Sequence, residues 1–206
     1  MKIDDNHIMK EQFIELLNST KREGIDKAII QLEEIGFFEA PASTKFHLCK
    51  KGGLMEHSLN VYTIAMDIRE TLIRRDENLE DLLPMDSVII TCLLHDVCKA
   101  DIYKPVVKCQ NNMGVCGHVS DYELDYQNLP IGHGEKSVVV LLRCGLDLTD
   151  DEILAIRWHM NAWDLAFQSE YMRNNFCEAK KLTPLLTLVQ SADAVASGIC
   201  ECFLSK

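Results

Sequence analysis

The sequence lacks the patterns that identify several common classes of protein. No apolar run is long enough to cross a membrane, and residues 1–7 are polar and acidic rather than the basic start of a signal peptide. There is no Gly-x-Ser-x-Gly elbow, P-loop or Rossmann fingerprint, which argues against acyl transfer, NTPase and dehydrogenase functions. No linker, repeat or low-complexity tract divides the 206 residues, so we expect a single domain.

An excess of positive charge is also missing. The chain has 32 acidic residues against 21 Lys and Arg, and its formal net charge is -11. A strongly acidic surface repels long polyanions, so we expect no binding of duplex nucleic acid, whereas small nucleotides remain compatible with this charge.

The cysteines do not form a disulfide framework. There are nine of them, an odd number, with no Cys-x-x-Cys pair and with several members in apolar segments. This pattern fits reduced thiols and predicts a cytoplasmic protein that is not associated with membranes.

The sequence does contain polar groups in segments that otherwise read as buried helix. Residues 88–99 are apolar on nearly every face until His95 and Asp96 follow one another. An ionised carboxylate in such a place is costly unless it pairs with a cation or binds a metal. Lys99 is one candidate partner, because it lies three residues after Asp96 on the same side of a helix, and a metal is the other.

Four further polar residues show the same anomaly. His57 lies on the apolar stripe of a helix that follows Gly52 and Gly53, and Asp193 is the lone carboxylate of the aliphatic segment 185–196. His159 takes an inward position in a helix that opens with a capping box at residues 149–152. His133 lies between two glycines at the start of a helix, where close approach of another element is allowed.

Each of these residues alone is more simply a hydrogen-bonded core residue. Together, four inward imidazoles and two buried carboxylates leave too many unsatisfied polar groups for a simple core, and a shared metal centre would satisfy them. Imidazole and carboxylate ligands suit Mn, Fe, Ni, Co or Zn, and a set without cysteine argues against a closed structural zinc site. We expect one or two divalent metals per chain. Two ions bridged by one carboxylate can lower the pKa of a shared water and orient it for attack on phosphorus.

The ordered set of residues resembles the HD-domain metal-dependent phosphohydrolases. The local strings at residues 52–59, 93–99, 132–137 and 191–193 are similar to the signatures of that family, and the resemblance spans about residues 45–200. It implies an all-α fold, an HD-domain helical bundle.

The resemblance also implies roles for individual residues. The first metal would be bound by His57, His95, Asp96 and Asp193. His133 and His159 would hold a second metal with Asp96 as the bridge, and Lys99 would contact substrate phosphate. One departure is visible, because family members commonly have glycine where this chain has Cys98.

Two segments are expected outside the helical core. Residues 1–44 read as an N-terminal helical extension packed on the core, with breaks at Gly24 and Gly36. Within residues 103–130 the periodicity changes, and residues 106–109 and 115–119 resemble two short strands around a turn. We therefore expect an inserted β-hairpin, which is either a lid over the site or a surface decoration.

Four residues are weaker candidates for substrate binding. His47 precedes Gly52 by five residues, and related proteins that degrade short RNA carry a histidine at this offset; the alternative is a solvated loop histidine. Tyr103 and Lys104 follow the helix of His95 closely enough to reach a pocket mouth, and Lys136 follows His133.

The sequence therefore predicts a metal-dependent phosphohydrolase that cleaves a phosphate ester of a small phosphorylated substrate, a nucleotide or a short oligonucleotide. Asp96 and Lys99 are the expected catalytic residues. The alternative is a regulatory module of the same fold that binds a metal or nucleotide without turnover. Loss of a ligand or of the lysine would favour that alternative, and the sequence retains both.

Overall fold

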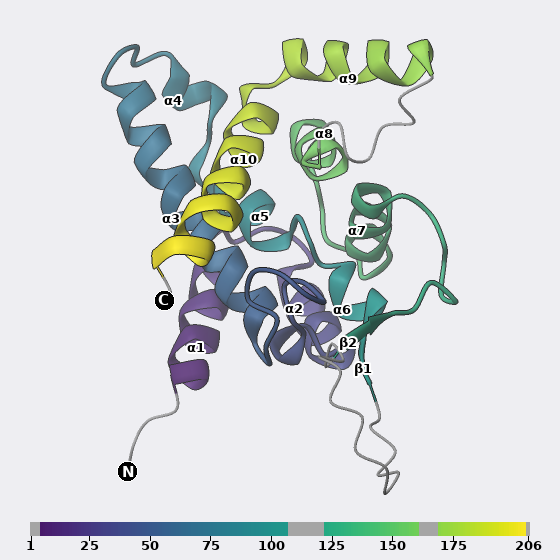
Figure 1. The fold of residues 1–206 in the computed structure, drawn as a ribbon. Coiled ribbons are helices and arrows are strands. Elements are labelled where there is room, and N and C mark those ends of the chain that lie inside the picture. The colour runs from purple at the N-terminus through teal and green to yellow at the C-terminus, as the bar shows by residue number, and fades with distance from the viewer. Residues whose placement is uncertain (1–4, 107–121, 161–168, 205–206) are drawn as a thin grey trace, which may run out of the picture.

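A computed structural model describes residues 5–106, 122–160 and 169–204 of the chain. These ranges are mostly helical, with a single short pair of strands (Figure 1). The predicted all-α fold with a small β insertion is confirmed. In chain order the elements are α1 (Asp5–Ser19), α2 (Ile25–Glu34), the 3-10 helix η1 (Phe37–Glu39), α3 (Gly53–Ile73), α4 (Leu79–Leu82), α5 (Met85–Leu94), α6 (Lys99–Ile102), β1 (Tyr103–Pro105), β2 (Tyr122–Leu124), α7 (His133–Arg143), α8 (Asp150–Trp158), α9 (Glu170–Leu182), α10 (Pro184–Val195) and the π-helix η3 (Ala196–Leu204).

Helix α3 is the centre of the packing. It contacts α1, α5, α10 and η3, and Figure 1 shows α10 returning beside it toward the C-terminus. The N-terminal part of this helix and the rest of it are buried in two different apolar clusters: Leu54 belongs to the first, with Phe13 and Phe37, and Val61 belongs to the second, with Val189. Helix α5 contacts both clusters along its length, because Val88 and Cys92 on one face belong to the second cluster and residues on the other face belong to the first. These two helices therefore run through the middle of the protein, where a side chain between the clusters is shielded from water.

The N-terminal helices contribute directly to the first cluster. Gly24 and Gly36 both adopt left-handed backbone conformations, with φ of 85° and 77°, and they separate α1, α2 and η1 as the sequence indicated. The rings of Phe13 and Phe37 are fully buried against each other, with centroids 5.3 Å apart. Residues 5–39 thus bury apolar surface on α3 and α5 and help to hold both helices in place.

The helix that carries His95 is shorter than expected. The sequence pattern predicts a helix that continues to Lys99, but α5 ends at Leu94 and the next four residues form turns before α6 begins. The amide of Lys99 bonds to the carbonyl of Asp96, and the amide of Ala100 bonds to that of Val97. These bonds span three residues instead of four, so the chain tightens here and the α-helical pattern is interrupted.

The strands of the insertion lie further apart in the sequence than we expect from its pattern. Tyr103 pairs with Leu124 and Pro105 with Tyr122, in antiparallel register. The pattern predicts strands at residues 106–109 and 115–119. Val106 lies just after β1, and the rest of both expected strands falls within residues 107–121, which are outside the described residues.

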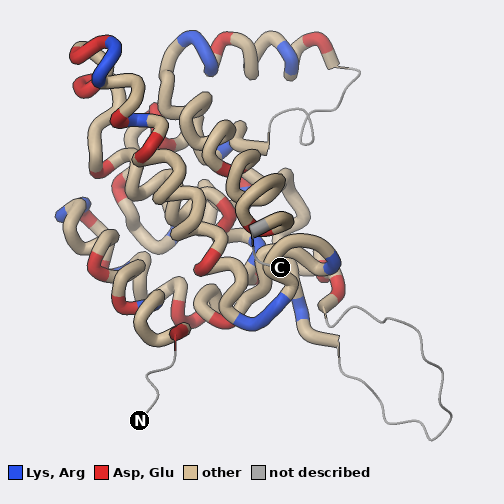
Figure 2. The backbone as a smooth tube through the Cα atoms, turned by 60° about the vertical axis from the view of Figure 1, so that its left-hand side comes forward, with Lys and Arg blue, Asp and Glu red and all other residues tan. Residues whose placement is uncertain are grey.

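Charged residues are distributed over the whole surface. Residues of both signs follow one another along α9, whereas Asp and Glu predominate in the N-terminal helices (Figure 2). Within the described residues, no helix is both long and apolar enough to cross a membrane.

A buried ion pair connects the N-terminal helices to α5 and α8. The guanidinium of Arg22 donates to both carboxylate oxygens of Glu152, at 2.7 and 2.8 Å, and to Asp86 at 2.6 Å. Glu152 is completely buried and also accepts from Ser87 at 2.6 Å. Because Glu152 is part of the capping box of α8, the same carboxylate both starts that helix and fixes its place against α5.

We predict that Arg22→Ala lowers the free energy of unfolding by about 3–5 kcal/mol, because Glu152 would remain buried without its cation. The control Arg75→Ala removes an exposed arginine and should change stability by no more than about 0.5 kcal/mol. Urea unfolding followed by circular dichroism measures both values, and equal stabilities of the two variants would contradict the role of this pair.

Candidate metal centre

His57 reaches the interior from the second turn of α3. The helix begins at two glycines. Gly52 adopts a left-handed conformation with a φ of 75°, and Gly53 allows a close approach of the backbone, because a Cβ there would lie 2.0 Å from the carbonyl oxygen of Leu48. His57 is fully buried, and its Nε2 lies 3.3 Å from Asp193 Oδ1 and 3.7 Å from Asp96 Oδ2.

His95 and Asp96 lie at the C-terminal end of α5. His95 follows the last helical residue, and its Nδ1 is 2.9 Å from the carbonyl oxygen of Cys92. Because a carbonyl only accepts, Nδ1 carries the proton and Nε2 is the ring atom that faces Asp96, 3.3 Å from Oδ2. Asp96 is 1% exposed, so this pair forms the interior floor of the site.

His133 and His159 approach from a second helix pair. His133 begins α7 and His159 follows α8, and a Cβ on Gly134 would lie 2.1 Å from the carbonyl oxygen of Arg157. The missing side chain of Gly134 therefore allows α7 to contact α8 closely, as the flanking glycines indicated. His159 repeats the geometry of His95, because its Nδ1 lies 2.7 Å from the carbonyl oxygen of Ile156.

Asp96 is shared by two groups of histidines. Its Oδ2 faces His57 and His95, whereas its Oδ1 lies 2.5 Å from the Nε2 of His133 and 3.2 Å from the Nε2 of His159. Each of the two carboxylate oxygens therefore faces a different pair of histidines.

Several polar atoms in this site lack hydrogen-bond partners. The Nε2 atoms of His57, His95 and His159 are buried, and none of them has a hydrogen-bond partner in the part of the chain that the structure describes. Buried ring nitrogens without partners are costly in a closed core. Two groups of ligand atoms, each within 4.8 Å of one another, could hold a metal here: His57 with His95 and Asp193, and His95 with Asp96 and His159. The donor set of imidazoles and carboxylates fits a divalent transition metal.

Lys99 lies against the same carboxylate. Its Nζ is 2.5 Å from Asp96 Oδ2. Burial raises the pKa of the Asp96 carboxyl, but the charges of Lys99, His95 and His133 outweigh this effect and hold that pKa well below its usual range. Asp96 is therefore an anion although it is buried, as a bridging ligand must be.

Two of the imidazoles, those of His57 and His133, bind protons strongly. Burial lowers the pKa of His57, but Asp193 and Glu201 outweigh it and raise this pKa to about 9. Burial likewise lowers the pKa of His133, and Cys98 and Asp96 raise it to about 10. A divalent cation would compete with these protons, because a ring nitrogen cannot hold both.

A cavity of about 700 Å³ opens beside this cluster. Lys99, His159 and Asp193 line it together with His47 and the 83% exposed ring of Phe46. The cavity gives a small molecule access to the side of the site on which Lys99 lies.

The weaker candidates for substrate binding occupy different places. His47 lines the cavity, whereas Tyr103 and Lys104 line a separate hollow of about 320 Å³ beside α2 and β2. Lys136 is 3% exposed, and its ammonium is 2.6 Å from Asp101 and 2.5 Å from the carbonyl oxygen of Asn128. Of these candidates, His47 therefore lies at the cavity beside the histidine cluster. Lys136 instead connects α7 to α6 and to the segment after β2.

Two residues near the site were not singled out from the sequence. Glu201 lies 2.9 Å from the Nδ1 of His57, and Gln190 lines the cavity. The sequence does carry a signal for Glu201, because it is the only charged residue in the apolar segment 194–204. Cys98, the departure from the family pattern, has its sulfur 3.4 Å from the Nδ1 of His133.

Comparisons with known proteins place the chain in a family. Over 134 residues the chain is 28% identical to the dihydroneopterin 2',3'-cyclic phosphate phosphodiesterase of Methanocaldococcus jannaschii. The match covers 59% of this chain and 51% of that protein, so the chain spans about half the length of this relative. No solved structure matches the chain. The family model of the HD domain matches residues 54–198, which include His57, His95, Asp96 and Asp193. This protein belongs to the HD domain family.

Proposed function

We propose that this protein is a metal-dependent phosphohydrolase that cleaves a phosphate ester of a small substrate, a nucleotide or a short oligonucleotide. The observation that carries the proposal is the shared Asp96 carboxylate, which faces His57 and His95 with one oxygen and His133 and His159 with the other. This arrangement suits two divalent ions, Mn, Fe, Ni, Co or Zn, bridged by Asp96.

We assign the ligands to the two sets that the sequence resemblance implies. His57, His95, Asp96 and Asp193 would hold the first ion, and Asp96, His133 and His159 the second. Bound ions would supply an activated water and would neutralise phosphoryl oxygens. The chain's own residues fix the orientation of the ligands, since the Nδ1 atoms of His95 and His159 are held by backbone carbonyls.

Lys99 is the proposed phosphate-binding residue. It lines the cavity next to Asp96, where its ammonium can donate to a phosphoryl oxygen and stabilise the charge that develops in the transition state. Its contact with the carboxylate keeps it in place before a substrate arrives.

The cavity also suits a planar ring in the substrate. Phe46 exposes most of its aromatic ring at the cavity wall, and His47 lies beside it. Aromatic side chains stack on heteroaromatic rings, which nucleobases and pterins both carry. The name of the Methanocaldococcus relative, which describes a cyclic phosphodiester of a pterin, adds such compounds to the substrates worth testing.

The activity can be tested with purified protein reconstituted with Mn, Fe, Co, Ni or Zn. Substrates should include 2',3'-cyclic nucleotides, nucleoside monophosphates, a cyclic pterin phosphate and short oligonucleotides. Release of a phosphate monoester or of inorganic phosphate would support the proposal. Stoichiometric binding of a metal without turnover of any of these compounds would instead favour the regulatory module.

Asp96→Ala should remove both metals and reduce hydrolysis by roughly 1000-fold or more, because the variant loses the group that serves both ions. Elemental analysis and initial rates measure the two effects. His7→Ala, which removes an exposed histidine that belongs to neither proposed ligand set, is the control. Full activity in the Asp96 variant would rule out this mechanism.

His133→Ala should lower the metal content from about two ions per chain to about one, because His133 contacts only the Oδ1 side of Asp96. The first ion should remain, held by His57, His95 and Asp193. An unchanged metal content would contradict the second ion, and loss of both would show that the two sites do not fill separately.

Metal binding should weaken as the pH falls. The pKa values of His57 and His133, about 9 and 10, mean that both rings carry two protons each at pH 7, and ligation removes one proton from each. Calorimetry in buffers of different ionisation enthalpy should therefore detect the release of about two protons when both sites fill. Binding without proton release would exclude these rings as ligands.

A further inference from the structure

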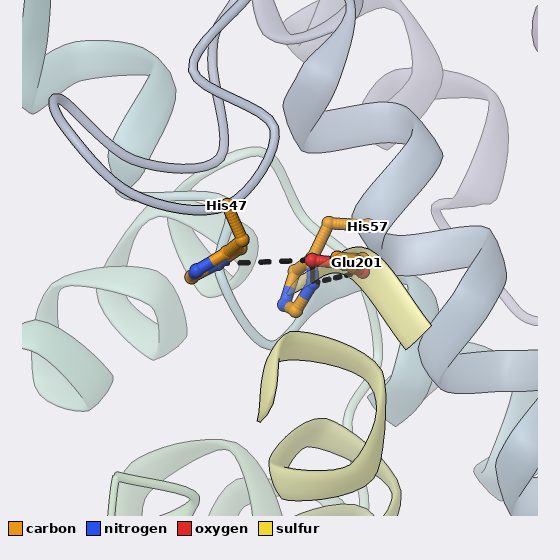
Figure 3. A group of neighbouring side chains, drawn as sticks. All are labelled: His47, His57 and Glu201. Atoms are coloured by element: carbon orange, nitrogen blue, oxygen red, sulfur yellow. Dashed lines mark hydrogen bonds and ion pairs between the residues drawn. The ribbon is translucent and has the colours of Figure 1, made fainter. Parts of the chain in front are cut away.

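Glu201 brings the C-terminal end of the chain to the metal centre. It lies in the π-helix η3, is 7% exposed, and points at His57 across 144 residues of sequence. Figure 3 shows the carboxylate meeting the His57 ring from one side while His47 approaches from the loop before α3.

The carboxylate is held by contacts with α3. Its Oε1 and Oε2 lie 2.9 and 3.2 Å from the Nδ1 of His57, and Oε1 also accepts from the amide of Asn60 at 3.0 Å. Asn60 follows His57 by three residues and so lies on the same face of the helix. Glu201 Oε2 is 3.9 Å from the Nε2 of His47.

The Nδ1 of His57 has its partner in another element, unlike the Nδ1 atoms of His95 and His159. His95 and His159 both follow the last residue of a helix, where a backbone carbonyl three residues earlier can accept from Nδ1. His57 lies within α3, and its Nδ1 contacts the Glu201 carboxylate at 2.9 Å. Glu201 therefore does for His57 what the backbone does for the other two rings.

We propose that Glu201 is a positioning residue of the metal centre, which accepts the Nδ1–H of His57 and thereby aims the Nε2 of that ring at Asp96 and Asp193. The inference rests on the proposed metal-dependent function. A carboxylate in this place fixes the ring orientation and strengthens the opposite nitrogen as a ligand.

The π-helical winding contributes to this contact. Helix α10 carries Asp193 and continues directly into η3, so one continuous segment supplies both a proposed ligand and the carboxylate that orients another. The wider turns of a π-helix change the direction in which later side chains point, and such turns are frequent at functional sites.

A different assignment makes Glu201 itself a ligand. Ligand atoms of His47, His57 and Glu201 lie within 4.8 Å of one another and could hold an ion. His57 would then have to bind one ion through each ring nitrogen and give up its Nδ1 proton. The hydrogen bond to Glu201 keeps that proton, which favours the positioning role.

A matched pair of variants separates the hydrogen bond from volume and charge. Glu201→Gln and Glu201→Leu are similar in size and both remove the negative charge, but only the glutamine can accept from Nδ1. Ile199→Ala, at an exposed position of the same π-helix, is the control for the integrity of that helix. Titration with Co²⁺ alone, followed by visible absorption, gives the affinity, the number of ions at saturation and a spectrum that reports on the ligands.

We expect Glu201→Leu to bind Co²⁺ about 10–100-fold more weakly than the unmodified protein, with the same number of ions at saturation. Glu201→Gln should recover a large part of this loss, and Ile199→Ala should match the unmodified protein. Asn60→Ala should weaken binding in the same direction by less, because Glu201 loses the amide donor of Asn60 but keeps its contact with His57.

Three outcomes would overturn the inference. Unchanged affinity in Glu201→Leu would show that His57 does not depend on Glu201, and equal losses in the glutamine and leucine variants would show that the hydrogen bond is not the cause. A loss of one ion at saturation, with the remaining affinity unchanged, would make Glu201 a ligand. If the unmodified protein binds no Co²⁺, Mn²⁺ or Fe²⁺, the proposed function itself is wrong.

Discussion

The structure depends on the burial of one ionised carboxylate. Asp96 is almost fully buried, and a single anion in such a place would cost several kcal/mol. Lys99 offsets part of this cost, and four imidazoles surround the two oxygens. The arrangement leaves three ring nitrogens without hydrogen-bond partners among the described residues, which a divalent cation would satisfy. The same feature that is unfavourable for stability is thus the basis of the proposed chemistry.

The surrounding helices serve to bring these groups together. The missing side chain at Gly134 allows α7 and α8 to meet, so that His133 and His159 reach the same carboxylate oxygen. The tightened turns after Leu94 separate α5 from α6 at the point where His95, Asp96 and Lys99 are needed. Arg22 and Glu152 connect α8 to the N-terminal segment, and Ser87 of α5 also donates to Glu152. These bonds join α8, which precedes His159, to α5, which precedes His95.

Much of this could be predicted from the sequence, because polar residues stand out in apolar segments. His57, Asp96 and Asp193 were visible in this way, and the capping box of α8 was readable from Thr149 and Glu152. The end of α5 could not be predicted, because its composition continues to favour a helix and only the local hydrogen bonds show the tighter turns. The role of Glu201 depends on a π-helix and on a contact with α3, neither of which has a periodicity in the sequence.

The position of ions around Asp96 is the most direct test of these conclusions. Crystals grown with Mn²⁺ and measured near its absorption edge would locate bound ions by their anomalous scattering. We predict two peaks about 3.5–4 Å apart, one beside each oxygen of Asp96. A peak only in another part of the protein, or no peak near Asp96 at saturating Mn²⁺, would contradict a metal centre built on this carboxylate.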